Sequence, residues 1–181
     1  MKRFVLIAAL VILAVATTGC FGLFEKPETA VPGQPNISPN PDGTEVELVL
    51  YFGDKNAEYL VAEVRKVIRK DESLEALAIR ELIKGPASAQ LTRTIPAEAK
   101  LLSVSVENGV AYVNFSRELQ TKHWGGSSGE LMTIYSIVNT LTERSNVQKV
   151  QLLLEGKKEE SIFGHSVTSE PIERRADLIK K

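Results

Sequence analysis

The sequence predicts an α+β fold, with a mixed sheet of about four to six strands and two helices packed on one face. Two kinds of pattern carry this prediction. Short segments alternate apolar with polar residues, as strands do, and longer segments repeat their apolar residues at the helical period. Along the chain these segments run strand, strand, helix, hairpin, helix and strand, with one further short strand.

The first two predicted elements are strands joined by a short turn. Residues 45–52 form the first strand, because their apolar side chains alternate along the segment. Residues 53–56 have the composition of a turn. Residues 59–68 are rich in β-branched side chains, which favours a returning strand and leaves a helix as the alternative. The apolar face of the first strand consists of Val46, Leu48, Leu50 and Phe52.

A helix is predicted over residues 73–84. Asp71 or Ser73 caps its start. The Lys-Gly-Pro sequence at residues 84–86 ends it, because glycine adopts the left-handed conformation and proline cannot continue a helix. The apolar stripe of this helix comprises Leu74, Leu77, Ala78 and Leu82.

The clearest hairpin pairs residues 101–107 with residues 110–116 across an Asn-Gly dipeptide, which is typical of a type I′ turn. A two-residue loop places Glu107 opposite Val110, so that paired residue numbers sum to 217. The pairs on the apolar face are Val106 with Ala111, Val104 with Val113, and Leu102 with Phe115. The opposite, polar face carries Ser103, Ser105, Tyr112 and Asn114.

A second helix is predicted over residues 128–144. Ser127 and Glu130 have the S-x-x-E spacing of a capping box at its start. Residues 147–155 then form a strand and residues 161–167 a short one, before an irregular basic tail. The inward stripe of the helix comprises Leu131, Ile134, Val138 and Leu141.

The first twenty residues predict export and lipidation. Residues 4–16 are thirteen consecutive apolar residues behind Lys2 and Arg3. A helix of that length spans about 20 Å, short of the roughly 30 Å hydrocarbon core of a bilayer, which favours a signal peptide. We therefore predict a lipoprotein-type signal peptide at residues 1–19 and a lipidated, palmitate-bearing Cys20, the only cysteine. The protein is then extracytoplasmic and anchored by lipid to the bacterial cell membrane.

A proline-rich linker is expected between this anchor and one folded domain. Residues 21–44 hold five of the eight prolines, which exclude a continuous helix or sheet. We expect the lipidated cysteine and a disordered linker at residues 20–44, the domain at residues 45–175, and a C-terminal tail at residues 176–181. The formal net charge of −1 argues against nucleic acid as a partner.

Six short motifs follow one another at characteristic spacings, at residues 82–86 (LIKGP), 94–96 (TIP), 101–104 (LLSV), 113–116 (VNFS), 137–142 (IVNTLT) and 147–150 (VQKV), with Gly156 after them. Together they resemble the GerMN domain family of sporulation and spore germination, over residues 45–174. The resemblance implies a fold similar to ring-building-motif domains. It also implies an envelope lipoprotein without known catalysis, and some members carry two copies where this chain has room for one.

One motif has the form of a serine hydrolase elbow, G-x-S-x-G at residues 125–129, with Ser127 as the nucleophile. Such an elbow needs a strand leading directly into it, with an acid and a histidine downstream. The preceding predicted strand ends well before it, and His165 is the only histidine downstream. We therefore predict no catalytic residue. The acids available as a third member are Glu155, Glu159 and Glu160.

The predicted interaction surface combines the polar hairpin face with the loop at residues 117–127. In that loop His123 precedes Trp124, the only tryptophan, and tryptophan is enriched at binding hot spots. Two histidines in the chain are too few for a metal site, so we expect no metal and no cofactor. The residues of this surface are Ser103, Ser105, Tyr112, Asn114, His123 and Trp124.

The expected function is that of a non-catalytic cell-envelope lipoprotein that binds other envelope proteins. The first alternative is a module that binds peptidoglycan or another envelope ligand, or that assists a sensor kinase. Basic clusters suited to anionic headgroups or wall polymers favour this alternative. The second alternative is a serine hydrolase that uses Ser127 as its nucleophile. The basic clusters are Arg65, Lys66, Arg69 and Lys70, and Arg174, Arg175, Lys180 and Lys181.

Overall fold

The computed structural model describes residues 43–181, which belong to the second of two units of the chain, Ser38–Lys181. The predicted signal peptide, the lipidated Cys20 and almost all of the predicted linker lie outside the described residues.

The first sheet is an antiparallel ribbon of two strands, β1 (Thr44–Gly53) and β2 (Leu60–Arg69). Both predicted strands are confirmed, including the choice of a strand over a helix for the second. The register places Phe52 opposite Val61. One face of the ribbon packs into the core through the alternating side chains of β1, of which Leu48, Leu50 and Phe52 are buried.

The second sheet has four strands in the order β3 (Leu101–Glu107), β4 (Val110–Phe115), β5 (Lys149–Leu154) and β6 (Ile172–Glu173). It is mixed, because β4 and β5 run parallel while the other neighbours run antiparallel. A parallel pair needs a crossover connection, and helix α3 (Ser127–Leu141) lies in it.

The hairpin of β3 and β4 follows the predicted register near its turn and departs from it at one pair. A β-bulge between Leu101 and Ser103 shifts the register, so that Leu101 faces Phe115 in place of Leu102. The prediction for Leu102 is therefore wrong, and its side chain is 48% exposed. The physical reason is that the extra residue of a bulge turns the strand's side chains to the opposite faces.

Helix α1 (Leu74–Lys84) begins as predicted, because the Ser73 hydroxyl accepts a hydrogen bond from the Ala76 N–H at 3.1 Å. Helix α2 (Glu118–Thr121) is a single turn. Helix α3 ends at Leu141, before the predicted residue 144.

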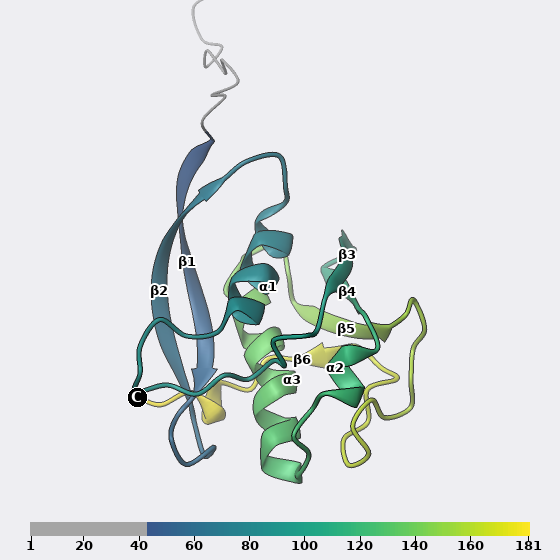
Figure 1. The fold of residues 1–181 in the computed structure, drawn as a ribbon. Coiled ribbons are helices and arrows are strands. Elements are labelled where there is room, and N and C mark those ends of the chain that lie inside the picture. The colour runs from purple at the N-terminus through teal and green to yellow at the C-terminus, as the bar shows by residue number, and fades with distance from the viewer. Residues whose placement is uncertain (1–42) are drawn as a thin grey trace, which may run out of the picture. The chain divides into compact units, whose positions relative to one another are not determined.

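The strands divide between two sheets, with α1 and α3 between them (Figure 1). The α+β class is confirmed, and the four-stranded sheet carries both helices on one face. The ribbon of β1 and β2 covers their other side. Thr140 of α3 accepts a hydrogen bond from the Tyr51 N–H at 3.0 Å, so α3 occupies the edge of β1 where another strand would pair. Helix α3 is consequently buried on nearly every side, through Ile134, Ile137, Val138 and Leu141.

The segment after β5 differs from the prediction. Residues 161–167 form no strand in the described chain, and β6 pairs with β5 instead. We call residues 157–171 the strap. Hydrogen bonds from side chains, and not a strand ladder, fix the strap. The Thr168 hydroxyl accepts from the Ile162 N–H and donates to the Glu159 carbonyl, each at 3.0 Å.

The last residues of the chain pack against the ribbon. A 3-10 turn at Ala176–Leu178 places Leu178 against Tyr51 and Leu60. The Lys180 N–H then donates to the Leu60 carbonyl at 2.8 Å, beside an isolated parallel bridge. The segment expected as a tail therefore extends the edge of β2 at one end.

Candidate functional site

The loop between α2 and α3 holds His123 in one orientation through two hydrogen bonds. Its Nδ1 accepts from the Gly125 N–H at 3.0 Å, and its Nε2 lies 2.9 Å from the Thr133 hydroxyl. Thr133 donates to the Thr94 carbonyl at 2.5 Å. These contacts assign the proton to Nε2, because Nδ1 faces a donor. Burial lowers the pKa of His123, which favours the same neutral ring.

His123 is the middle member of a row of three rings. Trp124 stacks on it with centroids 4.8 Å apart and an interplanar angle of 20°. Phe163 of the strap lies on it at 4.4 Å. Gly129 leaves room for the indole, because a Cβ at that position would lie 2.7 Å from Trp124 Nε1. Trp124 is nonetheless 51% exposed, so the loop presents a large apolar ring in a fixed position.

Clefts flank this row of rings. One cleft of about 430 Å³ has Trp124 in its wall, with Met132 of α3, the β1–β2 turn and residues 92–94. Two charged groups in its wall already have partners: Asp54 accepts from the Glu58 N–H at 2.9 Å, and Arg93 donates to the Lys84 carbonyl at 2.7 Å. The cleft therefore suits an apolar group. His123 and Phe163 line a second cleft of about 310 Å³.

The predicted capping box at the start of α3 is wrong. The residue before the helix is Gly126 at a φ of 79°, which makes no side-chain cap, and Ser127 is already helical. Glu130, 1% exposed, instead binds the strap. Its carboxylate accepts from the Ser166 N–H at 2.6 Å and lies 2.9 Å from His165 Nδ1. Burial opposes its ionisation, but these donors outweigh that effect and lower the pKa of Glu130.

The hydrolase geometry is not assembled. Among residues 43–181, no hydrogen bond joins Ser127 to either histidine. His165 pairs with Glu130, and Glu155 accepts from the Arg117 N–H at 2.8 Å. Within the same residues, no group of three or more His, Cys, Asp and Glu side chains is placed to hold a metal ion.

The polar face of the hairpin is only partly open. Ser103 and Ser105 of β3 are exposed. Tyr112 is half-buried, and Asn114 accepts from the Gly156 N–H at 2.7 Å, which ties it to the turn after β5. Beside Tyr112 in the sheet, Gln151 is fully buried under the strap. No hydrogen bond or ring contact within the described residues links this face to His123 and Trp124.

Comparison with known families identifies the fold. Residues 49–160, more than half of the chain, match the Germane family, described as "Sporulation and spore germination". The chain belongs to the Germane family. The resemblance to GerMN domains seen in the sequence is therefore confirmed. No curated protein matches the chain.

Solved structures agree with this family. The tandem GerMN domains of the sporulation protein GerM from Bacillus subtilis share 23% identity at a TM-score of 0.62, covering 83% of this chain and 51% of that one. The chain thus spans about half the length of the tandem protein. The first GerMN domain alone shares 25% identity at a TM-score of 0.59, covering 73% and 98%. A protein named "Putative Lipoprotein from Clostridium perfringens" shares 26% identity at a TM-score of 0.52, covering 71% and 87%.

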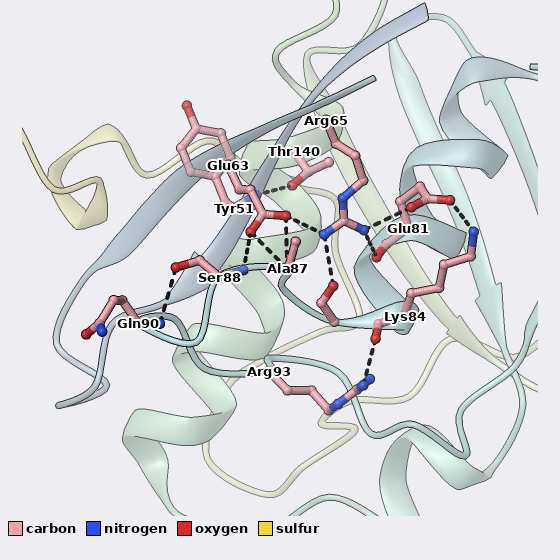
Figure 2. A network of polar contacts seen from close by, with 11 residues as sticks. Tyr51, Glu63, Arg65, Glu81, Lys84, Ala87, Ser88, Gln90, Arg93 and Thr140 are labelled. Atoms are coloured by element: carbon pink, nitrogen blue, oxygen red, sulfur yellow. Dashed lines mark hydrogen bonds and ion pairs between the residues drawn. The ribbon is translucent and has the colours of Figure 1, made fainter. Parts of the chain in front are cut away.

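In this Germane-family domain, the arginines of the basic clusters are largely engaged. Arg65 projects from the inner face of β2 and donates to Glu81 at 2.9 Å and to the Gly85 carbonyl at 3.0 Å, and it also pairs with Glu63 (Figure 2). Arg174 donates to the Asn139 carbonyl at 2.7 Å and pairs with Glu143. These guanidinium groups therefore hold elements together. None of the described helices is long and apolar enough to cross a bilayer.

Sequence reasoning missed two groups of this domain. Glu63 and Arg65 interrupt the alternating apolar face of β2, and that interruption is a signal that a charged pair faces inward. The contact of Glu130 with the strap joins residues 35 positions apart and leaves no local pattern.

Proposed function

We propose that this chain is a non-catalytic cell-envelope lipoprotein whose Germane domain binds another protein during assembly of an envelope complex. Lipid on Cys20 anchors the chain, and the proline-rich segment sets the distance of the domain from the membrane. The observation that carries the proposal is the exposed, orientationally fixed indole of Trp124 beside a cleft.

A fixed tryptophan favours association for two reasons. Burying the ring removes a large apolar area from water, and a ring that is already held in place loses little conformational entropy on binding. His123 and Gly129 fix Trp124 before any partner arrives. The adjacent cleft has an apolar wall, so we expect the partner to insert an aliphatic or aromatic side chain.

A non-catalytic role is supported by the surroundings of Ser127, which has no hydrogen bond to a histidine base within residues 43–181. The envelope location is supported by the basic start, the apolar segment and the cysteine at position 20. It is also supported by the similarity to a protein whose name includes "Putative Lipoprotein".

Purification of the full chain from chemically crosslinked membranes tests the assembly role. We expect defined partner proteins with the wild type, and their loss in Trp124→Ala. The matched control is Leu102→Ala, which removes a similarly exposed apolar side chain from β3. Equal recovery of partners with both variants would overturn the proposal. Lipidation is tested separately by mass spectrometry of the mature N-terminus, which we expect to be acylated Cys20; an unmodified cysteine would refute the anchor.

A further inference from the structure

The ribbon of β1 and β2 has one covered edge and one open edge. Helix α3 covers the edge of β1 through Thr140. Along Ala62–Ile68 of β2, no described segment pairs on the side away from β1. In Figure 1, β2 lies on the far side of β1 from the helices. An unpaired edge of this length is a template for another strand.

The orientation of the backbone groups follows from two contacts. The Leu60 carbonyl accepts from Lys180 on the open side. Tyr51, which is paired with Ala62, directs its N–H away from β2. Because backbone groups alternate along a strand, Ala62, Val64, Lys66 and Ile68 direct their N–H and carbonyl groups toward the open edge.

The same four residues point their side chains to the outer face of the ribbon, and all four are exposed. Val64 is 59% exposed and Ile68 51%. Between them, Lys66 lies opposite Glu47 of β1 in the register and forms a long ion pair of 3.8 Å with Glu45, with the side chains of Lys66 and Glu45 largely solvated. This edge therefore presents an apolar, a cationic and an apolar side chain in sequence.

We propose that the open edge of β2 binds an extended segment of a partner protein as an added strand, with an acidic side chain opposite Lys66 and apolar side chains on either side. Main-chain hydrogen bonds along Ala62–Ile68 supply the affinity, and the alternating side chains supply the specificity. The chain's own Ile179–Lys180 segment already forms a single parallel bridge at Leu60, at the end of the same edge. This surface is separate from Trp124 and does not depend on the role proposed for it.

A second copy of β2 fits this edge less well. The outward side chains of the open stretch include a lysine and no acid, so no antiparallel register of two β2 edges places a carboxylate of the second copy directly opposite Lys66. Charge complementarity therefore favours a different, acidic strand.

The test uses the full chain in detergent and a fluorescein-labelled peptide, acetyl-Thr-Val-Thr-Glu-Thr-Val-Thr-amide. The control peptide carries Lys in place of Glu. We expect fluorescence anisotropy to show tighter binding of the Glu peptide, and hydrogen exchange to slow in residues 60–69. Equal binding of the two peptides, or protection elsewhere, would overturn the proposal.

Two variants make the test specific. Val64→Pro removes an N–H from the open edge without touching the ladder to β1, so affinity for the Glu peptide should fall by about tenfold or more. Lys66→Glu should reverse the preference between the peptides. Affinity for the Glu peptide should fall and affinity for the Lys peptide should rise, each by about two- to fivefold. Unchanged binding in both variants contradicts the proposal. So does concentration-dependent dimerisation in sedimentation that Val64→Pro abolishes, because a second copy would then occupy the edge.

Discussion

The carboxylate of Glu130 lies 2.9 Å from Nδ1 of His165, and through this contact the first turn of α3 holds the strap. The same carboxylate also accepts the backbone N–H groups of His165 and Ser166. The strap in turn carries Phe163, against which His123 packs. Glu130 therefore supports the ring row that presents Trp124, although among the described residues it makes no hydrogen bond with the indole itself.

Replacing Glu130 by Gln is expected to destabilise the fold. The amide keeps the shape but loses the charge that the buried N–H donors stabilise, so the free energy of unfolding should fall by about 2 kcal/mol. Urea titration followed by tryptophan fluorescence measures this change. Glu98→Gln, at an exposed loop position, is the control and should change stability little. A Glu130→Gln protein as stable as the control would contradict the assigned role.

Stability should also depend on pH through His123. Burial lowers the pKa of its ring below the usual 6.5 in the folded state. As the pH falls below 6.5, the unfolded chain binds a proton at this position before the folded chain does. The contribution of the neutral His123 ring to the free energy of unfolding is therefore present above pH 6.5 and is lost as the pH falls through the folded-state pKa. Urea midpoints across this range should fall more steeply for the wild type than for His123→Gln. Parallel curves would show that the ring is not held neutral.

Gly129→Ala should move Trp124 with little change in stability. The new methyl group would lie 2.7 Å from the indole Nε1, so the ring must leave its stack on His123. Alanine in a helix gains up to about 1 kcal/mol over glycine, which offsets part of the lost packing. Because Trp124 is the only tryptophan, its emission maximum reports the displacement directly. Ser128→Ala, an exposed neighbour in the same turn, should leave the emission unchanged. An unshifted spectrum in Gly129→Ala would be inconsistent with this packing.

Arg65→Ala should destabilise the contact between β2 and α1. Its side chain is 15% exposed and that of Glu81 is 5%, so the substitution leaves a shielded carboxylate without its guanidinium. We expect a loss of about 2 kcal/mol in the free energy of unfolding. Lys66→Ala, the adjacent exposed residue of β2, should change stability by less than about 0.5 kcal/mol. Similar urea midpoints for the two variants would show that the Arg65 network contributes little.

The local elements of this fold could be predicted because their signals are local. Alternation in β1, the Ser73 cap and the Asn-Gly turn each determine the backbone of a few neighbouring residues. The division into two sheets could not be predicted, because periodicity shows which face of a strand is apolar but not what covers it. Thr140 of α3 binds the edge of β1, so that a helix and not a further strand covers that edge.

The candidate site was predicted in part for the same reason. Trp124 and His123 were found because aromatic residues in a glycine-rich loop stand out in the sequence. Their packing partner Phe163 lies in a segment expected as a strand, and its position depends on the long-range contact with Glu130. The predicted capping box failed because Gly126 adopts a positive φ, which places Ser127 inside the helix.

Photocrosslinking from position 124 in intact cells tests the central claim most directly. Benzoylphenylalanine in place of Trp124 puts a photoreactive ring at the exposed end of the stacked row. In the full-length chain we expect it to form an adduct with a defined envelope protein, while the same group at Leu102 does not. Absence of any protein adduct from position 124, with the chain present at its normal level in the membrane, would contradict a role in protein assembly through this surface.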